Sequence, residues 1–142
     1  MRALLDVNVL IALHDTDHVH HRLAADWLHA NAKEGWASCP LTQNGCLRIM
    51  GQSGYPNPQP LAILIPMLQR FAAAPMHALW DDDISLLDTA RFDHAHMNGH
   101  RQLTDLYLLG LAVKHGGRLV SFDARIATSA VRGAKPHHLV TL

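Results

Sequence analysis

Two short apolar runs that each end at an aspartate constrain the fold of this 142-residue chain more than any other feature. Residues 2–5 lead to Asp6, and residues 118–122 lead to Asp123. In an open parallel sheet, ligands bind in the crevice outside the carboxyl ends of the strands. If the two runs form neighbouring strands, both carboxylates therefore face one crevice.

The rest of the chain alternates between strand patterns and helix patterns. Residues 7–13 are apolar enough for either a strand or a buried helix, because periodicity does not separate the two. Further strands are expected over residues 36–38, 77–80 and 138–142. Helices are expected over residues 17–31 with Asp17 as cap, from Pro40 onward, over 61–74 with a kink at Pro66, over 85–92, over 105–115 with Thr104 as cap, and near 124–130. This alternation predicts one α/β domain over residues 1–142, a three-layer α/β/α sandwich with a mostly parallel central sheet.

Composition excludes several classes of protein. Hydrophobic residues make up 49% and charged residues 17%, so the chain has the means to fold by burial and is not disordered. Twelve basic and twelve acidic side chains cancel, which excludes a basic field over the whole molecule. Residues 101–142 nevertheless hold six basic and two acidic side chains, so a local patch for a polyanion remains open. The two cysteines have no metal-site spacing, and no segment reads as a signal or membrane span, so we expect a cytoplasmic protein without membrane contact.

Three aspartates occupy positions where burial makes a charge costly: Asp6, Asp105 and Asp123. The first and third follow the two apolar runs, and Asp105 begins a predicted helix. Clustered carboxylates repel one another, and either shifted pKa values or a bound cation must offset the repulsion. Three oxygen donors suit Mg²⁺ or Mn²⁺, because hard cations prefer carboxylate and water ligands. The alternative, in which each acid merely caps a helix or turn, remains open.

The same segments resemble the signature blocks of a known family. The blocks are Leu4-Leu5-Asp6-Val7-Asn8-Val9-Leu10-Ile11, Pro40-Leu41-Thr42-Gln43-Asn44-Gly45 followed by Leu47-Arg48, Thr104-Asp105-Leu106-Tyr107-Leu108 through Ala112, and Leu119-Val120-Ser121-Phe122-Asp123. Their order and the gaps between them resemble PIN-domain ribonucleases, specifically VapC-type toxins of VapBC toxin-antitoxin pairs. The resemblance covers nearly the whole chain.

The resemblance implies an endoribonuclease in which an acidic cluster binds Mg²⁺ or Mn²⁺. Asp6, Asp105 and Asp123 match three of the four acids that are usual in the family. The fourth is usually a Glu in the helix that begins at Pro40, where this chain offers Asn44 or Gly45. We expect Asn44 to take part in the site through its amide oxygen, with weaker affinity for the cation because it has no charge.

Four polar residues stand beside these acids. Thr104 and Ser121 match polar positions of the family, and Asn8 either caps a helix or orients Asp6. Arg48 is either a solvated helix residue or a contact to a substrate phosphate. Further candidates carry less weight: the acids Asp81, Asp82 and Asp83 are explained by the entry of the helix expected over residues 85–92, and the twelve histidines lack the spacing of a metal site.

Alternative functions follow from the same residues. A phosphatase of the haloacid dehalogenase type needs a second aspartate two residues after the first, where this chain has Asn8. A receiver-like phosphoacceptor needs paired acids and a late lysine, which are missing. The missing fourth acid leaves one rival, a PIN-like module that binds RNA or a partner and cuts weakly or not at all.

The resemblance also implies partners. Proteins of this type act on RNA, pair as homodimers and are neutralised by a VapB-type antitoxin whose C-terminal segment enters the acidic cleft, often with an arginine. Apolar side chains of residues 23–28 and 61–68 either line a groove for a partner helix or pack in the core.

Overall fold

The computed structural model describes residues 1–142 and has one five-stranded sheet in the order β3-β2-β1-β4-β5. Every pairing within the sheet is parallel. The strands are β1 (Ala3–Leu5), β2 (Trp36–Ser38), β3 (His77–Leu79), β4 (Arg118–Ser121) and β5 (Leu139–Thr141). The helices are α1 (Val7–His14), α2 (His21–Asn31), α3 (Pro40–Gly51), α4 (Leu61–Ala72) and α5 (Leu103–Lys114), with five short 3₁₀ turns between or after them. None of the helices combines the length and the apolar character that a membrane span requires.

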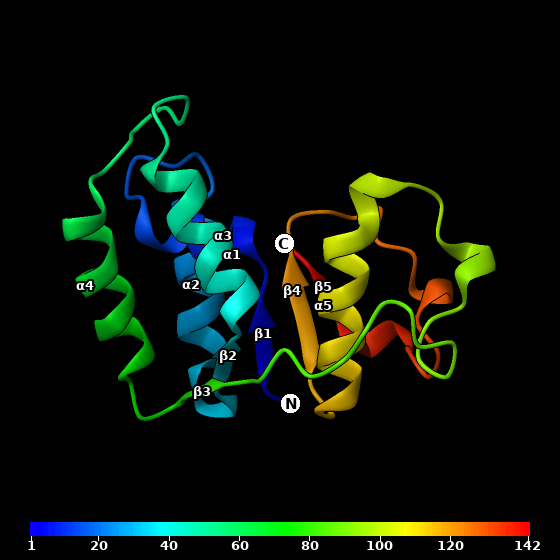
Figure 1. Ribbon diagram of the computed structural model, residues 1–142. Coiled ribbons are helices and arrows are strands. Elements are labelled where there is room, and N and C mark those ends of the chain that lie inside the picture. The colour runs from blue at the N-terminus through cyan, green and yellow to red at the C-terminus, as the bar shows by residue number, and fades with distance from the viewer.

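Two buried clusters lie on the two faces of this sheet. Leu4 and Leu119 belong to a cluster with the buried residues of α5, whereas Leu5 and Val120 belong to one with residues of α1, α3 and α4. Successive residues of a strand point to opposite faces, which is why neighbours in sequence enter different clusters. Figure 1 shows the consequence: α1 to α4 gather on one side of the central strands, and α5 lies on the other. The expected α/β/α layers are confirmed.

The central pairing of the sheet joins distant parts of the chain. β1 pairs with β4 in a register that sets Leu5 beside Val120. The carboxyl ends of the two strands lie at the same end of the sheet, where the chain continues at Asp6 and Phe122. The acids that follow β1 and β4 are therefore neighbours in space, as their places in the sequence predict.

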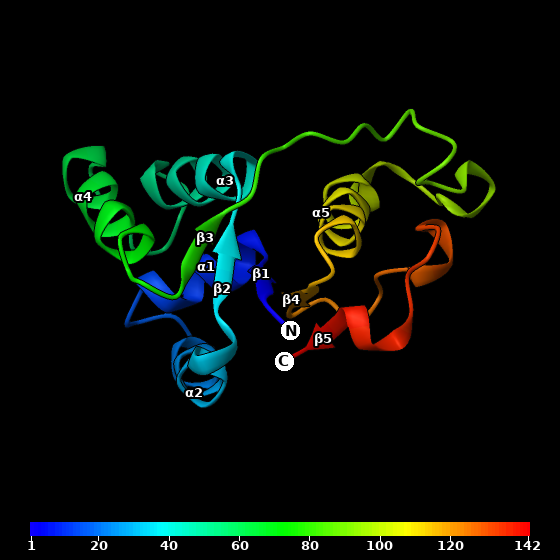
Figure 2. The ribbon, with the colours of Figure 1, turned by 90° about the horizontal axis from the view of Figure 1, so that it is seen from below.

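The segment between β3 and α5 crosses the molecule and brings the chain to the α5 side of the sheet (Figure 2).

Of the two structures open to residues 7–13, the chain adopts the helix, as part of α1. Several other sequence predictions need correction. Asp17 does not cap α2, which begins at His21 after its N-cap His20. Thr104 lies inside α5 rather than at its cap, which is Gln102 without a side-chain hydrogen bond. The last helical piece shrinks to one 3₁₀ turn at Thr128–Ala130. α4 contains Pro66, as expected, but ends at Ala72 rather than at residue 74.

The prediction of a helix over residues 85–92 is wrong. The Ser85 hydroxyl accepts the N–H of Leu87, and the Asp88 carboxylate accepts the N–H of Ala90, so side chains take up the amide groups and the segment forms turns. Two of the three acids before it contact other elements. Asp82 accepts the N–H of Leu41 at the start of α3, over 2.7 Å, and Asp83 pairs with Lys114.

Candidate active site

Asp6 links the sheet to α1. It is the N-cap of α1, and its Oδ1 accepts the N–H of Val7 over 2.7 Å. The side chain is only 3% exposed. Burial raises the pKa of Asp6 above its ordinary value and the negative charge of Asp123 adds to this, against the hydrogen bonds from Ser121 and Val7. Asp6 is therefore a buried carboxylate whose charge is only partly compensated.

Ser121 and Asn8 hold this carboxylate in place. Ser121, the last residue of β4, donates its hydroxyl to Oδ2 of Asp6 over 2.6 Å. Asn8 donates its amide to the Ser121 hydroxyl over 3.2 Å and accepts the N–H of Phe122 over 3.5 Å. Of the two roles open to Asn8, the structure supports orientation, because Asp6 itself is the cap. Ser121 and Asn8 thus act on Asp6 through hydrogen bonds across the β1–β4 junction.

Asp105 approaches the same place from the other layer. It lies in the first turn of α5 and is half-buried. Burial and the charges of Asp6 and Asp123 raise the pKa of Asp105 to about 6, against a smaller opposing effect of Arg125. Burial is the larger cause of this rise, and the rest shows that the three carboxylates interact, as expected of a candidate functional site.

Asp123 is the acid that does have a cationic partner. The Arg125 guanidinium donates from Nε to Oδ1 and from Nη2 to Oδ2, both over 3.0 Å, and the Arg125 N–H donates to Oδ1 over 2.8 Å. These contacts hold the pKa of Asp123 below its ordinary value. The N–H of Asp123 also donates to the Ser121 hydroxyl, over 3.1 Å, which ties Asp123 to the residue that holds Asp6.

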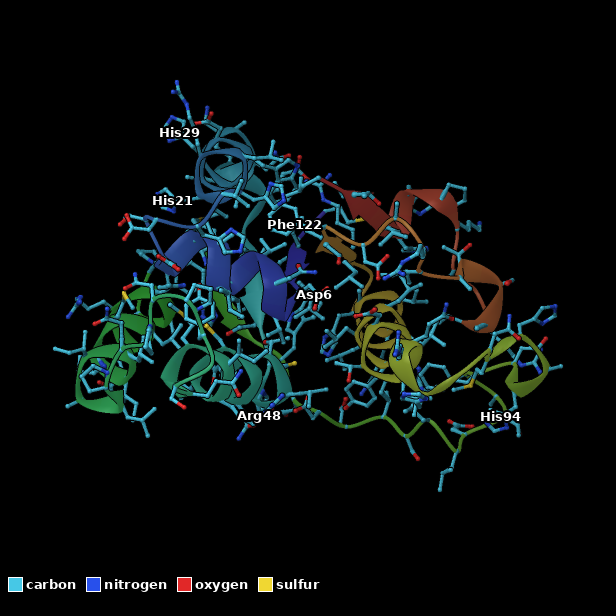
Figure 3. The ribbon with its side chains drawn as sticks, turned by 90° about the horizontal axis from the view of Figure 1, so that it is seen from above. Asp6, His21, His29, Arg48, His94 and Phe122 are labelled. Carbon is cyan, nitrogen blue, oxygen red and sulfur yellow. The ribbon has the colours of Figure 1, made fainter.

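Two hollows meet at Asp105. One, of about 340 Å³, is lined by Asp6, Asp105 and Thr104 together with α3 residues Asn44 and Arg48. The other, of about 360 Å³, is lined by Asp105 and Asp123. Its remaining walls are Asn98, Gly99, His100, Arg101, Gln102, Arg125 and Ile126. Figure 3 shows Asp6 at the centre of the molecule between α1 and α5, with Arg48 farther out on α3. The acids therefore sit between two hollows that each carry arginine.

The structure separates the two candidates for the missing fourth acid. Both residues line the hollow, but Asn44 is exposed and Gly45 is buried against α1. A Cβ at Gly45 would lie 2.8 Å from a methyl carbon of Val7, so a side chain there would require the Val7 side chain on α1 to shift. Of these two residues, Asn44 is the one with a side chain to present to the hollow. Thr104 is exposed at its rim.

The acids do not form a ready-made metal centre. No group of three or more His, Cys, Asp or Glu side chains lies close enough together to hold a metal ion. The structure brings Asp6, Asp105 and Asp123 to one opening but leaves Asp123 turned to Arg125. Oxygen ligands from carboxylates remain the donor chemistry that a hard cation prefers.

Sequence reasoning missed Arg125, His100 and Arg101 as members of the site. The one signal that could have found them is the excess of basic residues after position 100, to which Arg101 and Arg125 belong. Residue order alone does not place the 98–102 loop opposite the end of β4.

Comparison with known proteins agrees with this arrangement. Residues 3–131 match the family model described as PIN domain, and the chain belongs to the PIN-domain family. Within that family it groups with the VapC ribonucleases, as the sequence predicts. Ribonuclease VapC44 of Mycobacterium tuberculosis H37Rv is 48% identical over 142 residues, all of both chains. Ribonuclease VapC39 of the same strain is 41% identical over 134 residues, which are 94% of this chain and 96% of that protein.

A solved structure supports the fold. It is the crystal structure of VapBC2 from Rickettsia felis bound to a DNA fragment from their promoter, with a TM-score of 0.56. The match covers 87% of this chain and 89% of that one at 13% identity. The expected PIN-like α/β/α sandwich is thereby confirmed.

Proposed function

We propose that the protein is an endoribonuclease toxin that hydrolyses phosphodiester bonds of RNA. The observation that carries the proposal is the convergence of Asp6, Asp105 and Asp123 between two arginine-bearing hollows. It is supported by full-length relatives that are named ribonucleases. Two arginine-bearing hollows with the acids between them suit a strand of RNA, whose phosphates need positive partners away from the reacting one.

We further propose that the enzyme uses Mg²⁺ or Mn²⁺ held by the three aspartates, with Asn44 at the edge of the site. The donor set fits, because burial and the charges of Asp6 and Asp123 together raise the pKa of Asp105 to about 6, and a cation relieves both the desolvation of these carboxylates and their repulsion. Such an ion supplies a water of lowered pKa and positive charge beside the reacting phosphate.

The protein's own residues do the positioning. Ser121 and Asn8 fix the direction in which Asp6 presents its oxygens. Arg48 and Thr104 line the hollow on the α3 side, where they are placed to contact phosphate or sugar of the substrate. Arg48 makes no ion pair within the chain, which leaves its guanidinium available.

Cleavage of RNA with Mn²⁺ and with excess EDTA tests the proposal, with wild type compared with Asp6→Asn. We expect cleavage by the wild type in Mn²⁺ only, and a loss of at least about 100-fold in Asp6→Asn, since a metal site supplies several kcal/mol of transition-state stabilisation. Ser121→Ala is the matched control: it leaves all acids in place and should lose less activity. Equal cleavage with EDTA would disprove the metal, and RNA binding without cleavage in any metal would favour the non-cleaving module.

The partners follow from family membership. We propose a VapB-type antitoxin, a homodimer and a cytoplasmic location, with residues 1–142 as one domain. What supports an apolar partner surface is the exposure of Leu61, Ile63 and Ile65 on α4, beside a groove between α3 and α4 that includes Leu47 and Leu68. Residues 23–28 contribute less, because Ala24 is buried and Leu23 alone is well exposed among the apolar ones.

A further inference from the structure

Arg125 occupies a special position between the acids and the larger hollow. Its guanidinium makes a bidentate pair with Asp123 while lining the hollow that also contains Arg101 and His100. Asp123 is one of the proposed ligands of the cation. The residue that neutralises Asp123 is therefore also a wall of the space open to substrate.

The ion pair between Arg125 and Asp123 can be broken at little cost. The Arg125 side chain is 86% exposed, so breaking the pair returns it to water at little cost. A divalent cation needs the oxygens of Asp123 and is repelled by a guanidinium that faces both of them. Cation and guanidinium thus compete for one carboxylate.

A displaced guanidinium needs a new partner. Its fork of N–H groups matches the oxygens of phosphate as well as those of a carboxylate. The hollow beside it has only one carboxylate besides Asp123, namely Asp105, and we have assigned that to the cation. A phosphate of the RNA strand is the anion that would enter there.

We propose that Arg125 is a positioning residue that exchanges partners: it holds Asp123 until the cation binds and then contacts a phosphate of the RNA beside the cleavage site. This inference rests on the proposed metal-dependent ribonuclease function. It has a thermodynamic consequence. Because the cation frees Arg125 for the phosphate, cation and RNA must each increase the affinity for the other by the same factor.

The first test measures Mn²⁺ affinity by titration calorimetry without RNA, in wild type, Arg125→Ala, Arg125→Lys and Arg101→Ala. Arg101 lines the same hollow but does not contact Asp123, so its variant controls for the loss of one nearby positive charge. We expect Arg125→Ala to bind Mn²⁺ about 2- to 5-fold more tightly than Arg101→Ala, the range of an exposed ion pair. Arg125→Lys should fall between wild type and Arg125→Ala, and high salt should shrink the differences.

The second test measures binding of a hydrolysis-resistant 2′-O-methyl oligonucleotide by fluorescence anisotropy, with Mn²⁺ and with EDTA. Arg125→Ala should weaken binding several-fold in Mn²⁺ and by less than about 2-fold in EDTA, where the arginine is engaged with Asp123. Arg101→Ala should weaken binding to a similar extent in both.

The outcomes separate this inference from the proposed function. If wild type binds Mn²⁺ but Arg125→Ala binds it no more tightly than Arg101→Ala, the exchange is wrong and the metal site stands. The exchange is also wrong, with the metal site intact, if Arg125→Ala loses equal oligonucleotide affinity with and without Mn²⁺. If no variant binds Mn²⁺, both the metal site and the exchange are wrong.

Discussion

Helix α1 carries a buried aspartate at each end, and the two have opposite surroundings. Asp6 before the helix is 3% exposed and Asp15 after it is 4% exposed. Asp15 accepts hydrogen bonds from the Tyr55 hydroxyl, the Asn57 amide and the N–H of Asp17. Burial raises the pKa of Asp15, but these donors together outweigh burial and lower it. At Asp6, burial prevails over the donors and the pKa rises.

The contrast teaches that burial of an acid does not by itself mark an active site. Asp15 accepts hydrogen bonds from three donors, so it stabilises the fold by joining α1 to the loop after α3. Asp6 has fewer donors and interacts with the charge of Asp123. An acid that the fold leaves uncompensated is available to a cation, and one that the fold satisfies is not.

Substitutions at the two ends of α1 should differ most in their effect on the rate of RNA cleavage. Asp105→Asn, Asp6→Asn and their double variant should each lose at least about 100-fold in cleavage rate, and the double variant should be little worse than either single one, because the acids act as a unit. Asp15→Asn, assayed well below its melting temperature, should stay within a few-fold of wild type. Initial rates on one RNA substrate check this. Wild-type activity of Asp105→Asn would remove that residue from the site.

Stability should show the reverse order. Asp15→Asn removes the charge from hydrogen bonds with Tyr55 and Asn57 and should lower the free energy of unfolding by about 2 kcal/mol. Asp6→Asn should be at least as stable as wild type in EDTA, because it relieves repulsion at the site. Urea denaturation of the metal-free proteins measures both. Clear destabilisation by Asp6→Asn would show that its cap to Val7 matters more than the repulsion.

The smallest effect is the dependence of stability on pH. Because the pKa of Asp105 is raised to about 6, the folded protein binds a proton there more tightly than the unfolded chain does. The metal-free protein should therefore lose stability as the pH rises from about 4 to about 6. Asp105→Asn should reduce this loss and leave the part due to Asp6, whose pKa is also raised, so its gain over wild type should be larger at pH 7 than at pH 4.5. Asp15 has a lowered pKa, so its contribution should instead disappear at lower pH.

The sequence predicts the acids of the site better than the residues around them. An apolar run followed by aspartate is a local pattern, and a parallel sheet aligns the ends of such runs. The sequence alone therefore places Asp6 and Asp123 together. Asp15 could not be recognised, because its partners Tyr55 and Asn57 lie 40 and 42 residues away and meet it only through packing. Arg125 could not be recognised for a different reason. Its contact with Asp123 is local in sequence, but the hollow that it lines is formed with the distant 98–102 loop.

Helix ends show the same limit. Asp17 and Thr104 have the residue types of helix caps, yet neither caps its helix. Ser85 and Asp88 hold amide groups in turns where apolar spacing alone favours a helix. Small polar side chains form hydrogen bonds with backbone amides both at helix caps and in turns, and the sequence alone does not decide between the two.

The pairing of β1 with β4 has a consequence for the order in which this protein can be made. β1 ends at Leu5 and its partner begins at Arg118, so more than a hundred residues separate the halves of the site. A chain still growing from its N-terminus has α1 and its aspartate early but lacks Ser121 and Asp123 until late. Contacts of such separation form slowly, because a long loop must close first. The acidic cluster that we propose to cut RNA is therefore complete only after β4 has joined the sheet.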